Sequence, residues 1–150
     1  MKISTNQIKK LRDETGAGVI DVKHALEETS GNLPKAKTLL AKQGKAKAQK
    51  RAERPVAAGF IASYVHATGT VAALVALASE TDFVARTDEF KHLARELAMQ
   101  VASMDPKDTS DLLKQDYIRD SSKKVKDLIE ELIAKTGENI KIHQFSRLQI

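Results

Sequence analysis

The chain has 150 residues, a formal net charge of +5 and no cysteine. This length suits one ordinary domain, or a small domain joined to a medium one. The lack of cysteine excludes disulfides, thiolate metal sites and cysteine nucleophiles, and it fits a reducing compartment. The longest apolar run, Val71 to Ala78, is far shorter than the ~20 residues of a membrane-spanning helix, and the first six residues have no secretory apolar core. We therefore expect a soluble, intracellular protein outside the membrane.

The charge is unevenly distributed along the chain. Residues 1–54 hold 13 basic and 6 acidic side chains, a net charge of +7. Residues 55–150 hold 12 basic and 14 acidic side chains, a net charge of −2. Such an asymmetry indicates two units with different surfaces.

Helical spacing of apolar residues predicts three helices at the N-terminus, over residues 6–14, 19–28 and 33–44. Ser4 or Thr5 can cap the first helix. Asn32 can cap the third, where Pro34 falls in the first turn and its missing N–H costs nothing. Gly44 suits the end of the third helix. These residues form a compact helical unit near the lower size limit for independent folding.

A basic segment, Lys45 to Arg54, follows the helical unit and is closed by Pro55. It contains no apolar side chain larger than alanine, so we expect that it cannot bury a face. We interpret it as a solvated helical linker. This assignment gives three parts, at residues 1–44, 45–55 and 56–150.

The third part is predicted to be an α+β core. The pattern indicates a strand over residues 56–66, a hairpin turn with Gly69, and a central strand from Val71 to Ser79 that is apolar on both faces. A strongly periodic helix capped by Thr87 comes next, then a polar stretch, a helix that starts at Ser121 or Ser122, and a closing strand from Ile140. The fold class is therefore α+β, with three helices and a linker before a three-stranded antiparallel sheet covered by helices.

No residue pattern supports an enzyme. Gly16 and Gly18 follow a helix and lack the Gly-Lys-Ser/Thr ending of a phosphate-binding loop. The four histidines have no metal-ligand spacing, and the adjacent carboxylates at 88–89 and 130–131 point apart on helices. We therefore expect no catalytic residue, no metal ligand and no cofactor.

The most informative segment is Glu80 to Arg86, between the central strand and the helix capped by Thr87, with the sequence Thr81-Asp82-Phe83-Val84 inside it. Junctions of this kind lie on the surface and carry function on a rigid scaffold. Phe83 is one of only six aromatic residues, and its place beside Asp82 suggests a side chain that is inserted elsewhere. The alternative is that Phe83 packs in the core of this chain.

The basic run from Lys42 to Arg54 raises a second alternative, nucleic-acid binding, since lysine and arginine neutralise phosphates. The run has no interleaved aromatic residues for base stacking, and the core is slightly acidic. A solvated linker is the favoured interpretation.

Three ordered markers link the chain to a known family: the stretch Leu11 to Gly18, the stretch Thr81 to Ala85, and Gly137-Glu138-Asn139-Ile140. With these markers the chain resembles the elongation factor Ts family over nearly its whole length. The resemblance implies a ubiquitin-associated-like N-terminal domain and a guanine-nucleotide exchange factor that binds elongation factor Tu, both GDP-bound and nucleotide-free. It implies exchange without chemical catalysis.

The resemblance also implies roles for single residues. Phe83 would be a wedge that dislocates the Mg²⁺ site of the partner, with Asp82 beside it and Thr81 and Val84 framing it. The docking contacts on the partner would come from the helical unit: Leu11, Arg12, Val19, Ile20 and Lys23. Family members often carry two methionines where this chain has Val19 and Ile20.

The resemblance to short family members, together with an exposed sheet face, predicts a homodimer. The expected location is the bacterial cytoplasm, and an organellar location stays open. An adaptor that binds ubiquitin-like proteins through the first three helices is a third alternative, but it would leave Asp82 and Phe83 without a role.

Overall fold

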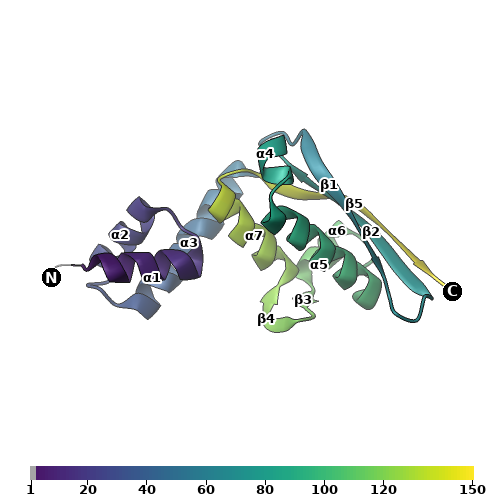
Figure 1. The fold of residues 1–150 in the computed structure, drawn as a ribbon, viewed down its shortest axis with the longest axis horizontal. Coiled ribbons are helices and arrows are strands. Elements are labelled where there is room, and N and C mark those ends of the chain that lie inside the picture. The colour runs from purple at the N-terminus through teal and green to yellow at the C-terminus, as the bar shows by residue number, and fades with distance from the viewer. Residues whose placement is uncertain (1–2) are drawn as a thin grey trace.

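The structure is a computed structural model that describes residues 3–150. Three helices lie at one end of the molecule and a three-stranded sheet at the other, where β5 ends the chain (Figure 1). The helical unit consists of α1 (Thr5–Thr15), α2 (Val19–Glu28) and α3 (Leu33–Arg51). The α+β class predicted from the sequence is confirmed.

The caps of the helical unit agree with the sequence prediction. Ser4 caps α1, since its side chain accepts a hydrogen bond from the Gln7 N–H, and Asn32 caps α3 through the Lys35 N–H. Gly16 ends α1 in the left-handed conformation, with φ of 66°. The unit has its own small core: Leu11, Val22, Ala25, Leu26, Ala36 and Leu40.

The sequence predicted that the third helix ends at Gly44. In the structure the helix continues to Arg51. The expectation that residues 45–54 cannot bury a face is also wrong. Gly44 and Ala48 are buried where α3 packs on α7 (Val125–Thr136). A Cβ atom on Gly44 would lie only 3.1 Å from the Ala134 Cβ, so the small residues allow the two helices to approach closely.

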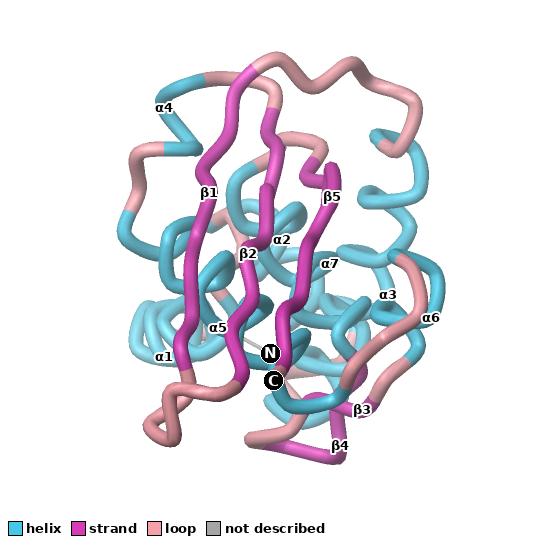
Figure 2. The backbone as a smooth tube through the Cα atoms, turned by 90° about the vertical axis from the view of Figure 1, so that its right-hand side faces the viewer, coloured by secondary structure: helices cyan, strands magenta, loops and turns pink. Residues whose placement is uncertain are grey.

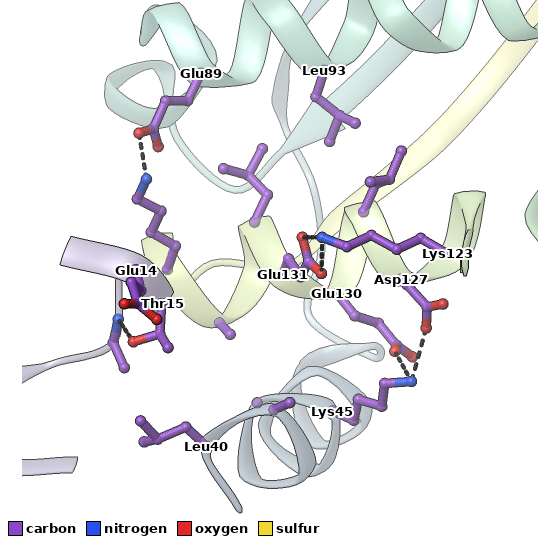
Figure 3. A pocket seen from close by; sticks show the side chains of 18 of the residues that line it. Glu14, Thr15, Leu40, Lys45, Glu89, Leu93, Lys123, Asp127, Glu130 and Glu131 are labelled. Atoms are coloured by element: carbon purple, nitrogen blue, oxygen red, sulfur yellow. Dashed lines mark hydrogen bonds and ion pairs between the residues drawn. The ribbon is translucent and has the colours of Figure 1, made fainter. Parts of the chain in front are cut away.

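Charged groups flank this contact between α3 and α7. The Lys45 ammonium lies 2.8 Å from the Asp127 carboxylate and 4.0 Å from that of Glu130 (Figure 3). Because Lys45 and the Lys124 N–H both donate to Asp127, the pKa of this carboxyl lies below its ordinary value. The same pairing raises the pKa of Lys45. The helical unit is thus joined to the core by packing and by charge.

The sheet consists of β1 (Ala58–Val65), β2 (Val71–Ser79) and β5 (Ile140–Gln149), in the order β1-β2-β5 with both pairs antiparallel. The central position predicted for Val71 to Ser79 is confirmed. The predicted hairpin turn is also present, with Gly69 at φ of 72° and the His66 N–H bonded to the Val71 carbonyl.

Helices cover one face of the sheet and leave the other bare. Helix α5 (Asp88–Met104) packs on β1 and β2, and its Phe90 is fully buried. Figure 2 shows the three strands in front, with the helices on their far side. Along β2 the buried residues Ala73, Val75 and Leu77 alternate with Leu74 on the bare face.

The segment between α5 and α7 differs from the prediction. It forms α6 (Thr109–Lys114) and a second, two-stranded sheet of β3 (Asp116–Tyr117) and β4 (Asp120–Lys124). The helix predicted to start at Ser121 or Ser122 begins at Val125. Ser122 lies within β4, where its N–H and hydroxyl both donate to the Asp120 carboxylate, so this serine does not cap a helix.

Within residues 3–150, no helix is both long enough and apolar enough to cross a membrane.

Asp127 should make the stability of the junction depend on pH. Its pKa is depressed in the folded chain, so its contribution is present above the ordinary carboxyl pKa and is lost as the pH falls through the folded value. Asp127→Asn keeps an acceptor for the Lys124 N–H but loses the charge. We expect it to cost at most about 1 kcal/mol at neutral pH, because Lys45 is half exposed.

Thermal unfolding of parent and variant, at neutral pH and again well below the ordinary carboxyl pKa, checks this expectation, and the difference should shrink as the pH is lowered. Asp88→Asn is the matched control, because Asp88 also lies in the first turn of a helix and has no ion pair within the described chain. An equal difference at both pH values for Asp127→Asn would contradict the assignment.

Candidate functional site

The segment singled out in the sequence forms an exposed projection at the end of the central strand. After Ser79 the chain leaves the sheet, and Asp82–Ala85 make the short helix α4, with Thr81 at its N-cap (Figure 1). The Phe83 side chain is 87% exposed. The alternative that Phe83 packs in the core of this chain is therefore excluded.

The outward direction of Phe83 follows from its neighbours. Ala85 is buried and Val84 packs against the main core, so α4 presents the opposite side to solvent. The Thr87 hydroxyl donates to the Val84 carbonyl at 2.7 Å and accepts from the Phe90 N–H, which confirms Thr87 as the cap of α5. Phe83 thus projects from a turn that is fixed at its C-terminal end by a helix cap.

Asp82 lies beside Phe83 on the exposed side. Its carboxylate is 3.1 Å from the Arg86 guanidinium, one turn along the chain, and both side chains are largely exposed. A pair of this kind contributes little to stability. Both groups therefore remain accessible to another protein.

The base of the projection is bonded to residues that the sequence analysis gave no individual role. Glu138 accepts hydrogen bonds from Thr81, and Glu80 accepts one from Asn139. Glu138 lies 57 positions from Thr81, so no local pattern reveals the contact. Only its membership in the third sequence marker drew attention to it.

The residues expected to dock on a partner occupy two environments. Val19 and Ile20 lie at the start of α2, where Ile20 is 72% exposed, and Arg12 and Lys23 are also exposed. Leu11, in contrast, is 1% exposed inside the helical unit. Leu11 therefore packs in the core of the helical unit and offers no surface for contact with another protein.

A hollow of ≈ 550 Å³ lies between the helical unit and the helices α5 and α7. Several of its charged side chains pair with one another, including Lys45 with Asp127 and Lys123 with Glu131 (Figure 3). Within residues 3–150, no group of three or more His, Asp or Glu side chains could hold a metal ion, and no buried side-chain nitrogen or oxygen lacks a partner.

Comparisons with known proteins agree with the markers in the sequence. The family described as "Elongation factor TS" matches residues 80–150. The chain is 42% identical to elongation factor Ts of Thermotoga neapolitana, with 100% of this chain and 98% of the relative aligned. It is 44% identical to that of Thermotoga maritima and 38% identical to that of Leptospira biflexa, again over 100% of this chain and over 97% and 98% of those relatives.

These similarities define the class, a translation elongation factor. The chain belongs to the elongation factor Ts family. Its alignment with the Thermotoga relatives runs over 193 positions although the chain has 150 residues, so at least 43 positions of the alignment have no counterpart here. Because the whole chain is aligned, the missing positions lie within the aligned region and not beyond its ends.

Phe83 and Phe90 should respond oppositely to the same substitution. Phe90→Ala removes a fully buried ring and should lower the free energy of unfolding by ~3–5 kcal/mol. Phe83→Ala removes an exposed ring and should change it by no more than ~0.5 kcal/mol. Chemical denaturation of both variants measures the difference. A cost for Phe83→Ala that approaches that of Phe90→Ala would mean that Phe83 is packed in solution.

Proposed function

We propose that the chain is a guanine-nucleotide exchange factor that binds elongation factor Tu with GDP bound and promotes GDP release, so that GTP can bind. The single observation that supports this most strongly is the 87% exposure of Phe83 at the end of the central strand. An exposed aromatic ring on a turn fixed by hydrogen bonds can push on another protein, and the chain gains no stability from exposing it.

The physical mechanism follows from the charge of the nucleotide. A GTP-binding protein holds GDP through backbone donors around the phosphates and through a Mg²⁺ ion that neutralises them. A ring that displaces the segment holding the metal first weakens the binding of the Mg²⁺ ion. The loss of the metal then weakens the binding of GDP. Phe83 is the wedge, Asp82 adjusts the neighbourhood of the metal, and Thr81 and Val84 hold the wedge. The factor acts by binding and breaks no bond.

The helical unit supplies affinity in this proposal. Val19 and Ile20 offer an apolar surface, with the charges of Arg12 and Lys23 beside it. The close contact between α3 and α7 connects this surface to the core that carries Phe83. Docking therefore brings the wedge near the metal site. The two binding equilibria are coupled reciprocally: GDP lowers the affinity of elongation factor Tu for the factor by the same ratio as the factor lowers its affinity for GDP.

A homodimer is part of the proposal. The bare face of the sheet exposes four large aliphatic side chains on its three strands, Ile61, Val65, Leu74 and Leu148. Exposed apolar patches of this kind mark interaction surfaces. A second copy of the chain would cover this face. Because elongation factor Tu acts in translation, we propose the bacterial cytoplasm as the location.

The nucleic-acid alternative gains no support. Three of the basic side chains in residues 42–54 are engaged in ion pairs: Lys45 with Asp127, Lys47 with Asp21 and Arg54 with Glu80. An adaptor built on the helical unit alone would again leave Phe83 without a role.

Phe83→Ala should remove most of the exchange activity. Release of a fluorescent GDP analogue from elongation factor Tu, followed by stopped flow, measures the rate. Asp82→Ala should cause a smaller loss, because the carboxylate adjusts the site and does not displace the metal-binding segment. Ile118→Ala is the control at an exposed apolar residue outside the projection, and with this variant GDP should be released at the parent rate. A folded Phe83→Ala variant with the parent rate would falsify the mechanism.

Ile20→Asp should weaken binding to elongation factor Tu about tenfold, because it places a charge in an apolar contact. The release rate at saturating concentration should stay close to that of the parent, since the wedge is intact. Titration of the release rate against factor concentration separates the two quantities. An unchanged half-saturating concentration would remove Ile20 from the docking surface.

Ile61→Asp should break the homodimer, because the substitution places a charge on the bare face of the sheet. Light scattering should give twice 16.5 kDa for the parent and 16.5 kDa for the variant. Ile20→Asp is the matched control, with the same substitution at a residue of similar exposure (72% against 68%) on the other unit, and it should remain dimeric. A monomeric parent chain at tens of micromolar would refute the dimer.

A further inference from the structure

The ladder between β2 and β5 ends where Ser79 pairs with Ile140. Beyond this pair, the residues that follow β2 and the residues that precede β5 are joined by hydrogen bonds to side chains. The Glu80 carboxylate accepts a hydrogen bond from the Asn139 N–H at 2.7 Å. In the other direction, the Glu138 carboxylate accepts from the Thr81 N–H at 3.0 Å and from the Thr81 hydroxyl at 2.6 Å. Three hydrogen bonds to carboxylates thus join the base of the projection to the turn before β5.

This turn is itself anchored. Asn139 is 1% exposed, and its amide donates to the carbonyls of Ala52, at 3.3 Å, and Arg54, at 2.7 Å. Gly137 ends α7 in the left-handed conformation, with φ of 78°, and so turns the chain toward β5. Glu138 therefore stands on a support that is tied both to the sheet and to the segment after α3.

Helix α4 needs contacts with the rest of the chain to hold its orientation. It has only four residues, and such short helices have little stability of their own. Thr81 is its N-cap, yet the Thr81 side chain makes no capping bond to the helix and instead donates to Glu138. The N-terminal side of α4 is thus held by the carboxylate, whereas Val84 and Ala85 hold its other side on the core.

We propose that Glu138 is a positioning residue for nucleotide exchange, which keeps Phe83 in the orientation that displaces the metal-binding segment of the partner. Asn139 fixes the turn on which Glu138 stands. This inference rests on the proposed exchange function. Hydrogen bonds to a charged group are stronger than those between neutral groups, so loss of the carboxylate frees the base of the projection.

Glu138→Ala should lower the maximal rate of GDP release about tenfold, while the half-saturating concentration stays near that of the parent, because the docking surface is untouched. Glu138→Gln should restore most of the rate. The glutamine carbonyl can accept from the Thr81 N–H, and its amide can donate to the Thr81 hydroxyl, which is both donor and acceptor. Glu131→Ala is the matched control, since Glu131 lies on α7 and pairs with Lys123 of β4, away from the projection.

Amide hydrogen exchange gives a measurement that does not depend on activity. In Glu138→Ala the amides of residues 81–86 should exchange faster than in the parent, while those of β2 keep their protection. Unchanged protection of residues 81–86 would overturn the proposal. So would faster exchange throughout β2, because Glu138 would then stabilise the sheet as a whole and not the projection.

A double variant connects Glu138 to Phe83. If Glu138 acts through the ring, Glu138→Ala should have no further effect on the release rate in the Phe83→Ala background. Independent losses that multiply would overturn the inference. If GDP release is slow with Phe83→Ala but occurs at the parent rate with Glu138→Ala, only the positioning role of Glu138 is overturned. A parent-like Phe83→Ala would instead overturn the proposed function itself.

Discussion

The pairing of β2 with strands on both sides is the constraint on which the other features depend. Its residues from Val71 to Ser79 are paired with β1 and with β5, so the strand cannot shift along its neighbours without loss of both ladders. This register fixes which side chains face α5 and which face solvent. It also fixes the point at which the chain leaves the sheet, and therefore the place of Phe83.

The contact between α3 and α7 has a second consequence. In the proposed exchange mechanism, a flexible linker would leave the helical unit free to move, so docking would bring Phe83 to its target only part of the time. A continuous α3, packed through Gly44 and Ala48 and held by Lys45, reduces this freedom before the partner binds. The conformational entropy is then lost on folding and not on association, which favours affinity.

Local signals in the sequence were sufficient for much of the fold. The caps at Ser4, Asn32 and Thr87, the hairpin turn and the central strand all depend on neighbouring residues, and each is present. The surface position of Phe83 was also predicted, because a large aromatic residue beside an acid at a junction is poorly explained by packing.

The features that sequence reasoning missed depend on residues far apart in the chain. The extension of α3 to Arg51 is stabilised by α7, which lies about eighty residues further on, as the separation of 82 positions between Lys45 and Asp127 illustrates. Strands β3 and β4 dock on α5, where the Gln100 side chain bonds to the backbone of Asp116 and Ile118. The contact of Glu138 with Thr81 is likewise invisible to any local pattern.

The most direct test of the central claim is the rate of GDP release from elongation factor Tu with the parent chain, measured with millimolar Mg²⁺ and again with the metal removed by a chelator. If the factor acts by disturbing the metal site, its acceleration of release should be large with Mg²⁺ and much smaller without it. An equal acceleration in both conditions, or no acceleration in either, would contradict the account.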